Sequence, residues 1–414
     1  MSKVFIAGVG MTAFGRAPDK SVDQLAGEAI GLALEDACCA TTDVGAAYYA
    51  GTTNGFLQGQ YFIPGPIVLR KAGLQGIPVF TVENACASGS SAFNLAVQAL
   101  EAGTCDIALA VGAEKMNIPD KAKMFAVFDA GWDVSTVAQN KATLLALGAG
   151  IEPPPGTVSD KPYSVFMEVY AAFCRNHMQR YGTTQAQIAA VAAKNHQHSV
   201  HNPLSQYRES YTVEQVLAAP PITYPLTLPM CSPISDGAAA AVLCTEEGLR
   251  RLQHARPRAV EVLASVVQMG VDHLPEEREK GIGHLAARRA YELAGVAPED
   301  VDVAEVHDAT AMGEILNAEA LMLAPFGEGG PAAERGDFTI GGRIPINPSG
   351  GLESKGHPIG ATGLGQIHEL VTQLRGEAGP RQVEGARIAA HENGGGLYGI
   401  EEAVVAINLL ARTS

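Results

Sequence analysis

Cys86 is the residue whose surroundings point most directly to chemistry. It lies in residues 82–91, which read Val-Glu-Asn-Ala-Cys-Ala-Ser-Gly-Ser-Ser. The apolar run at 79–82 predicts a buried strand before it, and helical spacing that ends at Gly103 predicts a helix after it. A helix N-terminus presents free N–H groups and favours an anion such as a thiolate. We therefore predict that Cys86 is a nucleophile. The alternative, a small buried hydrophobe, is our interpretation of the other six cysteines.

Position alone does not ionise this thiol. The helix end contributes about 0.3–1 kcal/mol, whereas a tenfold change in ionisation needs about 1.4 kcal/mol. A base or a cation must therefore lie nearby. His357 is the natural partner, because Pro358 fixes the chain beside it and Gly356 and Gly360 permit close backbone approach. A neutral imidazole there takes the thiol proton and leaves a thiolate–imidazolium pair.

Two further segments carry groups that could stabilise charge. His307 ends an apolar strand, where α/β proteins place ligand-binding groups. It is either a hydrogen-bond donor to a developing oxyanion or a structural cap of the strand. Residues 391–396 read His-Glu-Asn-Gly-Gly-Gly, and the glycines predict a loop whose N–H groups form an oxyanion hole. Glu392 is either an acid or base of that site or a solvated loop charge.

No metal site is predicted. The seven cysteines form no Cys-x-x-Cys pair, so a structural zinc site is not indicated. His196, His198 and His201 are close in sequence, but their spacing does not fit one face of a helix, and we predict a polar loop. An odd number of cysteines without framework spacing indicates a reducing compartment.

The composition is that of a folded protein with two or three cores. The chain has 414 residues, of which 47% are hydrophobic and 18% charged. A net charge of −15 argues against a general binder of nucleic acid or of anionic membranes. No apolar run approaches the length of a membrane span, and the N-terminal run is too short for a signal peptide. We expect a cytoplasmic protein without membrane insertion.

The order of predicted elements occurs twice along the chain. Each half has a strand, a helix, and later a glycine-containing turn that leads into a helix and a further strand. In the first half the strand lies at 3–8, and the helix begins at Ser21, which forms a capping box with Gln24. The turn with its helix lies at 86–102, and the further strand at 107–111. In the second half they lie at 259–268, 284–294, 356–374 and 386–390, with an additional strand at 301–306. Two halves rich in βαβ units, at 1–250 and 256–414, predict two mixed sheets that enclose helices.

The segment from about 115 to 229 departs from this pattern. It contains three consecutive prolines at 153–155, the only tryptophan, and two predicted helices at about 163–180 and 184–195. An insertion of this length usually covers an active site. We predict a loop domain inserted in the first half.

These motifs resemble those of the thiolases, and most closely those of the sterol-carrier-protein-2 type and the archaeal type. Residues 82–89 resemble the nucleophile motif. Residues 307–310, His-Asp-Ala-Thr, resemble the His-Asp motif of those subfamilies. Residues 350–363 resemble the Gly-His-Pro motif, the most specific of the set, and 231–238 resemble the segment that closes the first half. The resemblance covers nearly the whole chain.

The resemblance implies a function and a role for each matched residue. An acyl-CoA would acylate Cys86, and His357 would activate the thiol and help to bind the thioester oxygen. His307 would hold the first oxyanion site, and the N–H groups of Cys86 and Gly394 would form the second. Coenzyme A would be a co-substrate, with no permanently bound cofactor and no metal.

The resemblance also implies an architecture and partners. We expect a five-layered α-β-α-β-α fold with a covering loop domain that binds coenzyme A. A homodimer or tetramer that acts in lipid metabolism is expected. Archaeal-type members often bind a small OB-fold protein, and the sequence does not exclude such a partner for this chain. Arg175, Arg180, Lys194 and Arg208 are candidates for the coenzyme A phosphates by charge only.

One position departs from the family pattern. Common thiolases carry a second cysteine before the glycine run, where this chain has Glu392, and some sterol-carrier-type members place it where this chain has Ala309. No cysteine follows Cys244. Our hypothesis is that Glu392, together with His307, handles the proton on the α-carbon, because burial can raise the pKa of a carboxyl group.

Three functions are therefore considered. The first is a thiolase that cleaves a 3-ketoacyl-CoA or catalyses the reverse Claisen condensation. The second is a thiolase-like enzyme that passes the acyl group from Cys86 to another carbon acceptor. The third is a degenerate thiolase that only binds an acyl-CoA or a protein partner. The motifs do not select an acyl chain length or a direction of reaction.

Overall fold

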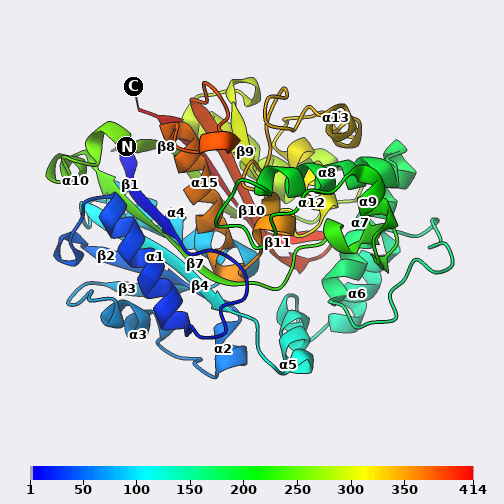
Figure 1. Cartoon of the computed structure of the whole chain (residues 1–414), viewed down its shortest axis with the longest axis horizontal. Coiled ribbons are helices and arrows are strands. Elements are labelled where there is room, and N and C mark those ends of the chain that lie inside the picture. The colour runs from blue at the N-terminus through cyan, green and yellow to red at the C-terminus, as the bar shows by residue number, and fades with distance from the viewer. Residues whose placement is uncertain (1–2, 414) are drawn as a thin grey trace.

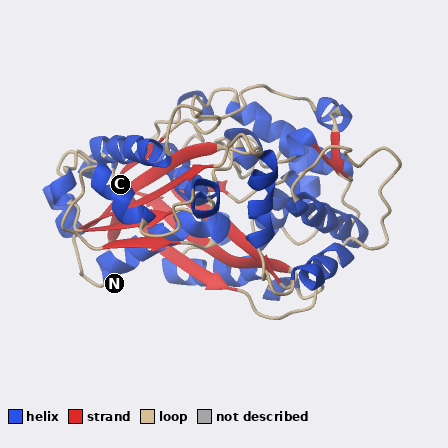
Figure 2. Ribbon diagram, turned by 90° about the horizontal axis from the view of Figure 1, so that it is seen from below, coloured by secondary structure: helices blue, strands red, loops and turns tan. Residues whose placement is uncertain are grey.

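The computed structural model of this chain describes residues 3–413. Its centre is a mixed nine-stranded sheet in the order β3-β2-β4-β7-β1-β8-β11-β10-β9, with helices on both faces (Figures 1 and 2). The strands of the first half are β1 (Val4–Met11), β2 (Ala46–Ala50), β3 (Val79–Val82), β4 (Ile107–Lys115) and β7 (Asp236–Thr245). Those of the second half are β8 (Val260–Met269), β9 (Val303–Glu305), β10 (Ile388–Tyr398) and β11 (Glu401–Arg412). A separate two-stranded ladder joins β5 (Pro221–Thr223) and β6 (Leu226–Thr227).

The second half repeats the strand pairing of the first. The series β1-β7-β4-β2 has two antiparallel pairs followed by a parallel pair, and β8-β11-β10-β9 has the same sequence of pairs. The prediction of two separate sheets is corrected in one respect. The edges of the two series meet in a short antiparallel pairing of Val4 to Ile6 on β1 with Val262 to Val260 on β8, so the sheet is continuous.

Helices form three layers, with the two halves of the sheet between them. Helix α1 (Val22–Asp36) covers β1, β7 and β4, and α11 (Ile282–Ala294) covers β8 and β11. Between the halves lie α4 (Ser88–Glu101) and α15 (Thr362–Arg375), which contact each other and strands of both halves. The predicted α/β class and its α-β-α-β-α layers are confirmed.

The remaining helices are short or lie in the covering segment. That segment forms one end of the molecule, at the right of Figure 1. It comprises α5 (Lys121–Ala126), α6 (Val137–Ala146), α7 (Val165–Tyr181), α8 (Gln185–Ser199) and α9 (Val213–Ala218). The others are α2 (Asn54–Gln58), α3 (Pro64–Lys71), α10 (Glu246–Arg251), α12 (Ala311–Ala320), α13 (Gly329–Arg335) and α14 (Gly351–Lys355).

Local sequence signals account for several element ends. Ser21 begins α1 with the predicted capping box, in which its backbone N–H donates to Gln24 Oε1 at 2.9 Å. Gly295 ends α11 in the left-handed region, with φ of 67°. The prediction that 79–82 is a buried strand is wrong, because β3 is the outermost strand of the sheet and Phe80 is 53% exposed.

Two further predictions about local structure are corrected. The glycine run is not a loop, because β10 continues through it and pairs with β11 from Ile388 to Tyr398. His196 and His198 lie in α8 and are buried rather than in a polar loop. Within residues 3–413, no helix is long and apolar enough to cross a membrane.

Candidate active site

Cys86 lies in a tight turn that the sequence builds between β3 and α4. The turn is a single 3-10 turn, Ala85–Ala87, which runs directly into α4. Ala85 has φ of 48°, a left-handed conformation that is costly for alanine and is found where surrounding contacts enforce it. Ser88 supplies such contacts, because its Oγ donates to Ala85 O at 2.7 Å and accepts from the Asn84 N–H at 2.8 Å. The strained residue thus fixes the thiol at the helix end.

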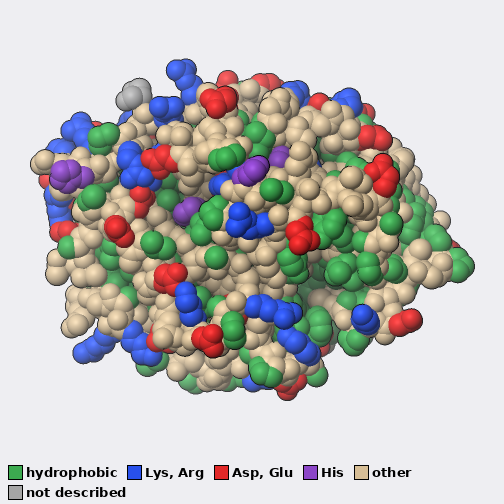
Figure 3. Space-filling model, viewed as in Figure 1, with side chains coloured by type: hydrophobic (Ala, Val, Ile, Leu, Met, Phe, Trp, Pro, Cys, Tyr) green, Lys and Arg blue, Asp and Glu red, His purple; other side chains and the backbone are tan. Residues whose placement is uncertain are grey.

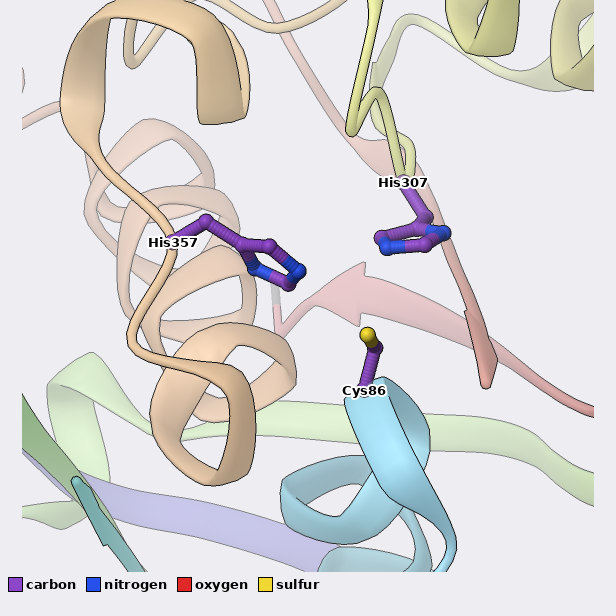
Figure 4. Close-up of side chains that lie close together, drawn as sticks. All are labelled: Cys86, His307 and His357. Carbon is purple, nitrogen blue, oxygen red and sulfur yellow. The ribbon is translucent and has the colours of Figure 1, made fainter. Parts of the chain in front are cut away.

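The structure brings Cys86, His307 and His357 together. The sulfur and one ring nitrogen of each histidine all lie within 4.8 Å of one another. The two imidazole centroids are 5.3 Å apart, and the rings are tilted by 56°. Figure 4 shows the sulfur directed from the end of α4 toward the space between the two rings.

His357 is held by neutral partners. Its backbone N–H donates to Ser235 Oγ at 2.9 Å, and its Nδ1 lies 2.7 Å from Thr362 Oγ1. The Thr362 hydroxyl donates its own proton to Pro358 O at 3.1 Å, so it must accept from Nδ1–H. This bond fixes the tautomer and leaves Nε2 with a lone pair.

His307 is held by charged partners. Its Nδ1 lies 3.1 Å from Glu402 Oε1, and its backbone N–H donates to Glu392 Oε2 at 2.8 Å. Its carbonyl accepts from Asn317 Nδ2 at 2.9 Å. The ring Nε2 is buried and makes no hydrogen bond within the part of the chain that the structure describes. Nε2 is therefore the free nitrogen of this ring.

The surroundings move the pKa values of the two histidines in opposite directions. Burial lowers the pKa of His307, but its contacts with the Cys86 thiol and the Glu402 carboxylate outweigh burial and raise that pKa well above its ordinary value. Burial, the nearby positive charge of His307 and that of Lys355 hold the pKa of His357 well below its ordinary value. The surroundings therefore favour the protonated form of His307 and the neutral form of His357, which is the pattern expected of an acid paired with a base.

Buried ionic groups join the segments that carry the two histidines. Asp308, next to His307, accepts from the Leu352 N–H at 2.8 Å and from Asn195 Nδ2 at 3.0 Å. Glu305, at the end of β9, accepts from Ser349 Oγ at 2.8 Å and from Lys355 Nζ at 2.9 Å. Loss of one partner of such a buried pair costs about 3–5 kcal/mol. The network thus fixes the strand end at His307 against the segment that leads to His357.

A cavity of about 990 Å³ opens over the three side chains. Most of its lining is apolar, with the aromatic residues Phe56, Tyr61, Phe125, Phe128, Phe166 and Tyr170 among it. Its polar lining includes Glu402 and Glu353. Figure 3 shows hydrophobic side chains gathered around a hollow in one face of the molecule. A cavity of this size can hold a drug-sized ligand, with a few polar groups to orient it.

Glu392 does not line this cavity, contrary to the expectation for an acid or base of the site. Its side chain is fully buried in β10, where one oxygen accepts from His307 and Oε1 has no partner within residues 3–413. Burial and the negative charge of Glu402 raise its pKa well above the ordinary value, which favours the protonated form. Gly394 is also outside the lining, whereas Gly396 is part of it.

The predicted coenzyme A ligands are also absent from the cavity wall. Arg175, Arg180, Lys194 and Arg208 are not among the residues that line it. Lys194 is buried and pairs with Glu314 at 2.9 Å. Arg175 donates to Tyr224 O at 2.7 Å. Lys194 and Arg175 are thus engaged in contacts within the protein.

The same three atoms form a set that could hold a metal ion. A cysteine and two histidines are ligands that Zn²⁺ accepts, with a fourth position left for water or substrate. The other ring nitrogen of each histidine is hydrogen-bonded, that of His307 to Glu402 and that of His357 to Thr362. Histidines that bind a metal usually make a second hydrogen bond of this kind. Geometry alone thus permits both a nucleophile and a metal ligand at Cys86.

Comparison with known proteins decides the family. The model described as Thiolase, N-terminal domain matches residues 4–215, and the model described as Thiolase C-terminal domain-like matches 281–408. The chain is 39% identical to sterol carrier protein 2 of Bos taurus over 98% of this chain and 71% of that protein. It is 38% identical to an acetyl-CoA acetyltransferase of Methanothermobacter thermautotrophicus over 96% of this chain and 98% of that one. This chain belongs to the thiolase family.

A solved structure agrees with this assignment at the level of the fold. The structure titled Ltp2-ChsH2(DUF35) aldolase superposes with a TM-score of 0.77 over 100% of this thiolase chain and 98% of its own. The two sequences are 22% identical, so the likeness extends to the architecture alone.

Sequence reasoning missed three residues that hold the histidines of this thiolase: Ser235, Thr362 and Glu402. Glu402 carried a detectable signal, because two adjacent glutamates open a strand that is mostly apolar. Its relation to His307 depends on the pairing of β10 with β11, which the expected loop at 394–396 concealed. Ser235 and Thr362 lie inside matched motifs but give no sign of their partners before the fold is known.

Proposed function

We propose that this thiolase is an acyltransferase that carries the acyl group of an acyl-CoA on Cys86. The observation that carries the proposal is the placement of the Cys86 sulfur within 4.8 Å of two imidazole nitrogens at the floor of a large cavity. A thiol at a helix end beside imidazoles is the arrangement of an activated sulfur nucleophile.

The reaction that fits these groups is reversible thiolytic cleavage. The Cys86 thiol gives its proton to an imidazole, and the thiolate attacks the keto carbon of a 3-ketoacyl-CoA. The bond between C2 and C3 breaks, and acetyl-CoA leaves after its α-carbon takes up a proton. The shortened acyl group then passes from sulfur to the thiol of a second coenzyme A, which returns its proton to the site. Condensation is the same sequence in reverse.

Mass spectrometry tests the covalent step. Incubation with a panel of acyl-CoAs should add the mass of one acyl group to the intact chain, and digestion should place it on Cys86. Cys86→Ser should abolish the stable adduct. The matched control is Cys38→Ser, because Cys38 is a free thiol that is more exposed and lies outside the cavity. An adduct that persists in Cys86→Ser would overturn the proposal.

Two further readouts separate the competing functions. Release of the acyl group on addition of coenzyme A supports thiolysis, whereas release only with a different carbon acceptor supports the second hypothesis. No adduct with any thioester supports the degenerate thiolase. The zinc alternative is tested by dialysis against a chelator, since a metal ligand at Cys86 would require activity to fall and to return with Zn²⁺.

We also propose that the protein is a homodimer. Strand β3 forms an open sheet edge on which Phe80 is 53% exposed and stacks on Tyr48 with centroids 5.5 Å apart. An apolar edge of this kind is normally covered in a stable protein. Light scattering should give a mass of two 43.1 kDa chains, or 86.2 kDa. A monomeric mass would contradict the proposal. A small partner protein is a further candidate, since the structural neighbour is titled as an assembly that includes a DUF35 component.

A further inference from the structure

Glu114 is a fully buried carboxyl group near the end of β4, and the proposed reaction does not use it. It is not part of the cavity lining. Its Oε1 accepts from the backbone N–H groups of Thr52 at 2.5 Å and Gly360 at 3.2 Å, and its Oε2 accepts from Thr53 Oγ1 at 2.5 Å. One side chain therefore joins two segments that are far apart in the sequence.

The first of these segments leads to the turn of Cys86. Thr52, whose N–H is bonded to Glu114, donates its hydroxyl to Ala85 O at 3.1 Å. Ala85 directly precedes Cys86 and has the left-handed conformation described above, with φ of 48°. A strained residue of this kind keeps its conformation only while its surroundings enforce it. The bond from Thr52 is thus one of the contacts that fix the direction of the thiol.

The second segment carries His357. Gly360 follows it by three residues and lies in the 3-10 turn Ile359–Ala361 that leads into α15. This turn packs backbone to backbone, because a Cβ on Gly89 of α4 or on Gly112 of β4 would overlap Gly360 O. A Cβ on Gly360 itself would overlap Glu114 Oε1. The turn of His357 is therefore pressed against β4 at the point where Glu114 bonds it.

We infer that Glu114 is a positioning residue that holds the turn of Cys86 and the turn of His357 at one separation, so that the thiol and the imidazole stay in contact. The inference rests on the proposed acyl transfer at Cys86. The two side chains reach the site from these two turns (Figure 4). A displacement of reacting groups by about 1 Å can lower a rate about 10²-fold, even when its cause lies outside the site.

The hydrogen bonds of Glu114 do not depend on its charge. Burial raises the pKa of Glu114 to about 7. The N–H groups of Thr52 and Gly360 both reach Oε1, whereas Oε2 faces the Thr53 hydroxyl, which can accept a proton as well as donate one. A neutral acid therefore keeps the same links. Glutamine keeps them too, with its carbonyl oxygen in place of Oε1 and its amide group toward Thr53.

The rate of alkylation of Cys86 at different pH values tests the inference without any acyl-CoA. Iodoacetamide reacts with the thiolate, and mass spectrometry of the Cys86 peptide excludes the other cysteines. In Glu114→Ala the thiolate loses close contact with its imidazole, so the midpoint of the rate profile should rise by about one pH unit, a tenfold lower rate below both midpoints. Glu114→Gln should restore the wild-type midpoint, because the links are made again.

Steady-state kinetics give a second measure. Glu114 touches neither the cavity nor the reacting atoms, so Glu114→Ala should lower kcat about 10²-fold and leave KM within about threefold. A thermal melt confirms that each variant is folded. A purely structural role would lower the melting temperature of Glu114→Ala and leave the alkylation midpoint of the folded protein where it is in the wild type. That result overturns the inference, as does an equal shift in Glu114→Gln.

A pair of milder variants decides the matter if Glu114→Ala does not fold. Thr52→Val keeps the N–H that bonds Glu114 but removes the hydroxyl that reaches Ala85 O, so the midpoint should rise, by less than in Glu114→Ala. Thr53→Val is the matched control, because its hydroxyl bonds the same carboxyl group and, within residues 3–413, makes no hydrogen bond to the turn of Cys86. Its midpoint should be unchanged. Equal midpoints in Thr52→Val and Thr53→Val overturn the inference.

The inference and the proposed function fail in different ways. The proposed function fails if the wild type forms no acyl adduct at Cys86, whatever the alkylation profile of the Glu114 and Thr52 variants. The inference fails if the adduct forms and the midpoints do not move.

Discussion

His307 and His357 reach one sulfur from two regions of the same half of the chain, and their second bonds differ. The turn after β9 places His307 against a carboxylate on β11, and the turn before α15 places His357 against a hydroxyl within its own segment. The pKa of the first ring is raised and that of the second is lowered. The two side chains are identical and both lie beside the sulfur. The hydrogen-bond partners of their Nδ1 atoms therefore account for the different directions of their pKa shifts.

Removal of the Cys86 sulfur should have the largest effect on the rate of acyl transfer. In Cys86→Ala we expect acyl transfer to fall by at least about 10³-fold, since the nucleophile is lost. The pKa of His307 should also fall, because its contact with the Cys86 thiol is one of the causes that raise it, while His357 stays neutral. NMR titration of labelled histidine checks both rings. Equal movement of the two signals would show that the rings are not differentiated by their partners.

Replacement of each histidine in turn should affect the half-reactions differently. His357→Asn should slow acylation of Cys86 by about 10²–10⁴-fold, the range for loss of a general base, because its Nε2 carries the lone pair that can take the thiol proton. His307→Asn should slow acylation and the transfer to coenzyme A by similar factors of about 10²-fold, because both steps form an oxygen anion that a protonated ring stabilises. Single-turnover measurements with an acyl-CoA, followed by addition of coenzyme A, separate the two steps. Unchanged acylation in His357→Asn would show that His357 is not the base that activates the thiol.

A smaller effect is expected when the neutral partner of His357 is changed. Thr362→Val keeps the shape of the side chain but removes the hydroxyl that accepts from Nδ1–H and donates to Pro358 O. The lost hydrogen bonds should lower the free energy of unfolding by about 1–3 kcal/mol, because the groups left behind are buried. The tautomer of His357 is then no longer fixed, so acylation of Cys86 should slow by about tenfold. Urea unfolding and the same single-turnover assay measure the two effects.

The sequence predicted the elements of this site better than their connections. The hydrophobic spacing around Ser21, Cys86 and residues 284–294 located helices within a few residues, because each has an amphipathic pattern and a terminal signal of its own. The glycine run at 394–396 was interpreted as a loop, because glycine is usually a strand breaker. In the fold Gly395 must lie against the backbone of the Cys86 turn, where a Cβ would overlap Asn84 O, so glycine is needed inside the strand.

The charge state of the site could not be predicted from local sequence. Glu402 is separated from His307 by 95 residues and Ser235 from His357 by 122, so their hydrogen bonds depend on strand pairing and on the packing of two halves. The buried links of Asp308 and Glu305 to the segment 349–355 have the same origin. Pattern reasoning found the reacting groups because motifs keep them near glycines and prolines, whereas the partners that set their protonation come from distant segments.

The smallest effect is expected at Glu392, the residue that the missing second cysteine first suggested as a base. Its buried side chain, whose pKa is raised well above the ordinary value, accepts the His307 N–H with one oxygen, and glutamine can make the same bond with its carbonyl oxygen. Glu392→Gln should therefore keep thiolysis and condensation within about threefold of wild type at neutral pH. Glu402→Gln, which changes a carboxylate on the same histidine, is the matched comparison and should show a pH shift that Glu392→Gln lacks. A loss of about 100-fold in Glu392→Gln would mean that this carboxyl group handles the α-proton after all, and the division of labour between the two histidines would have to be redrawn around it.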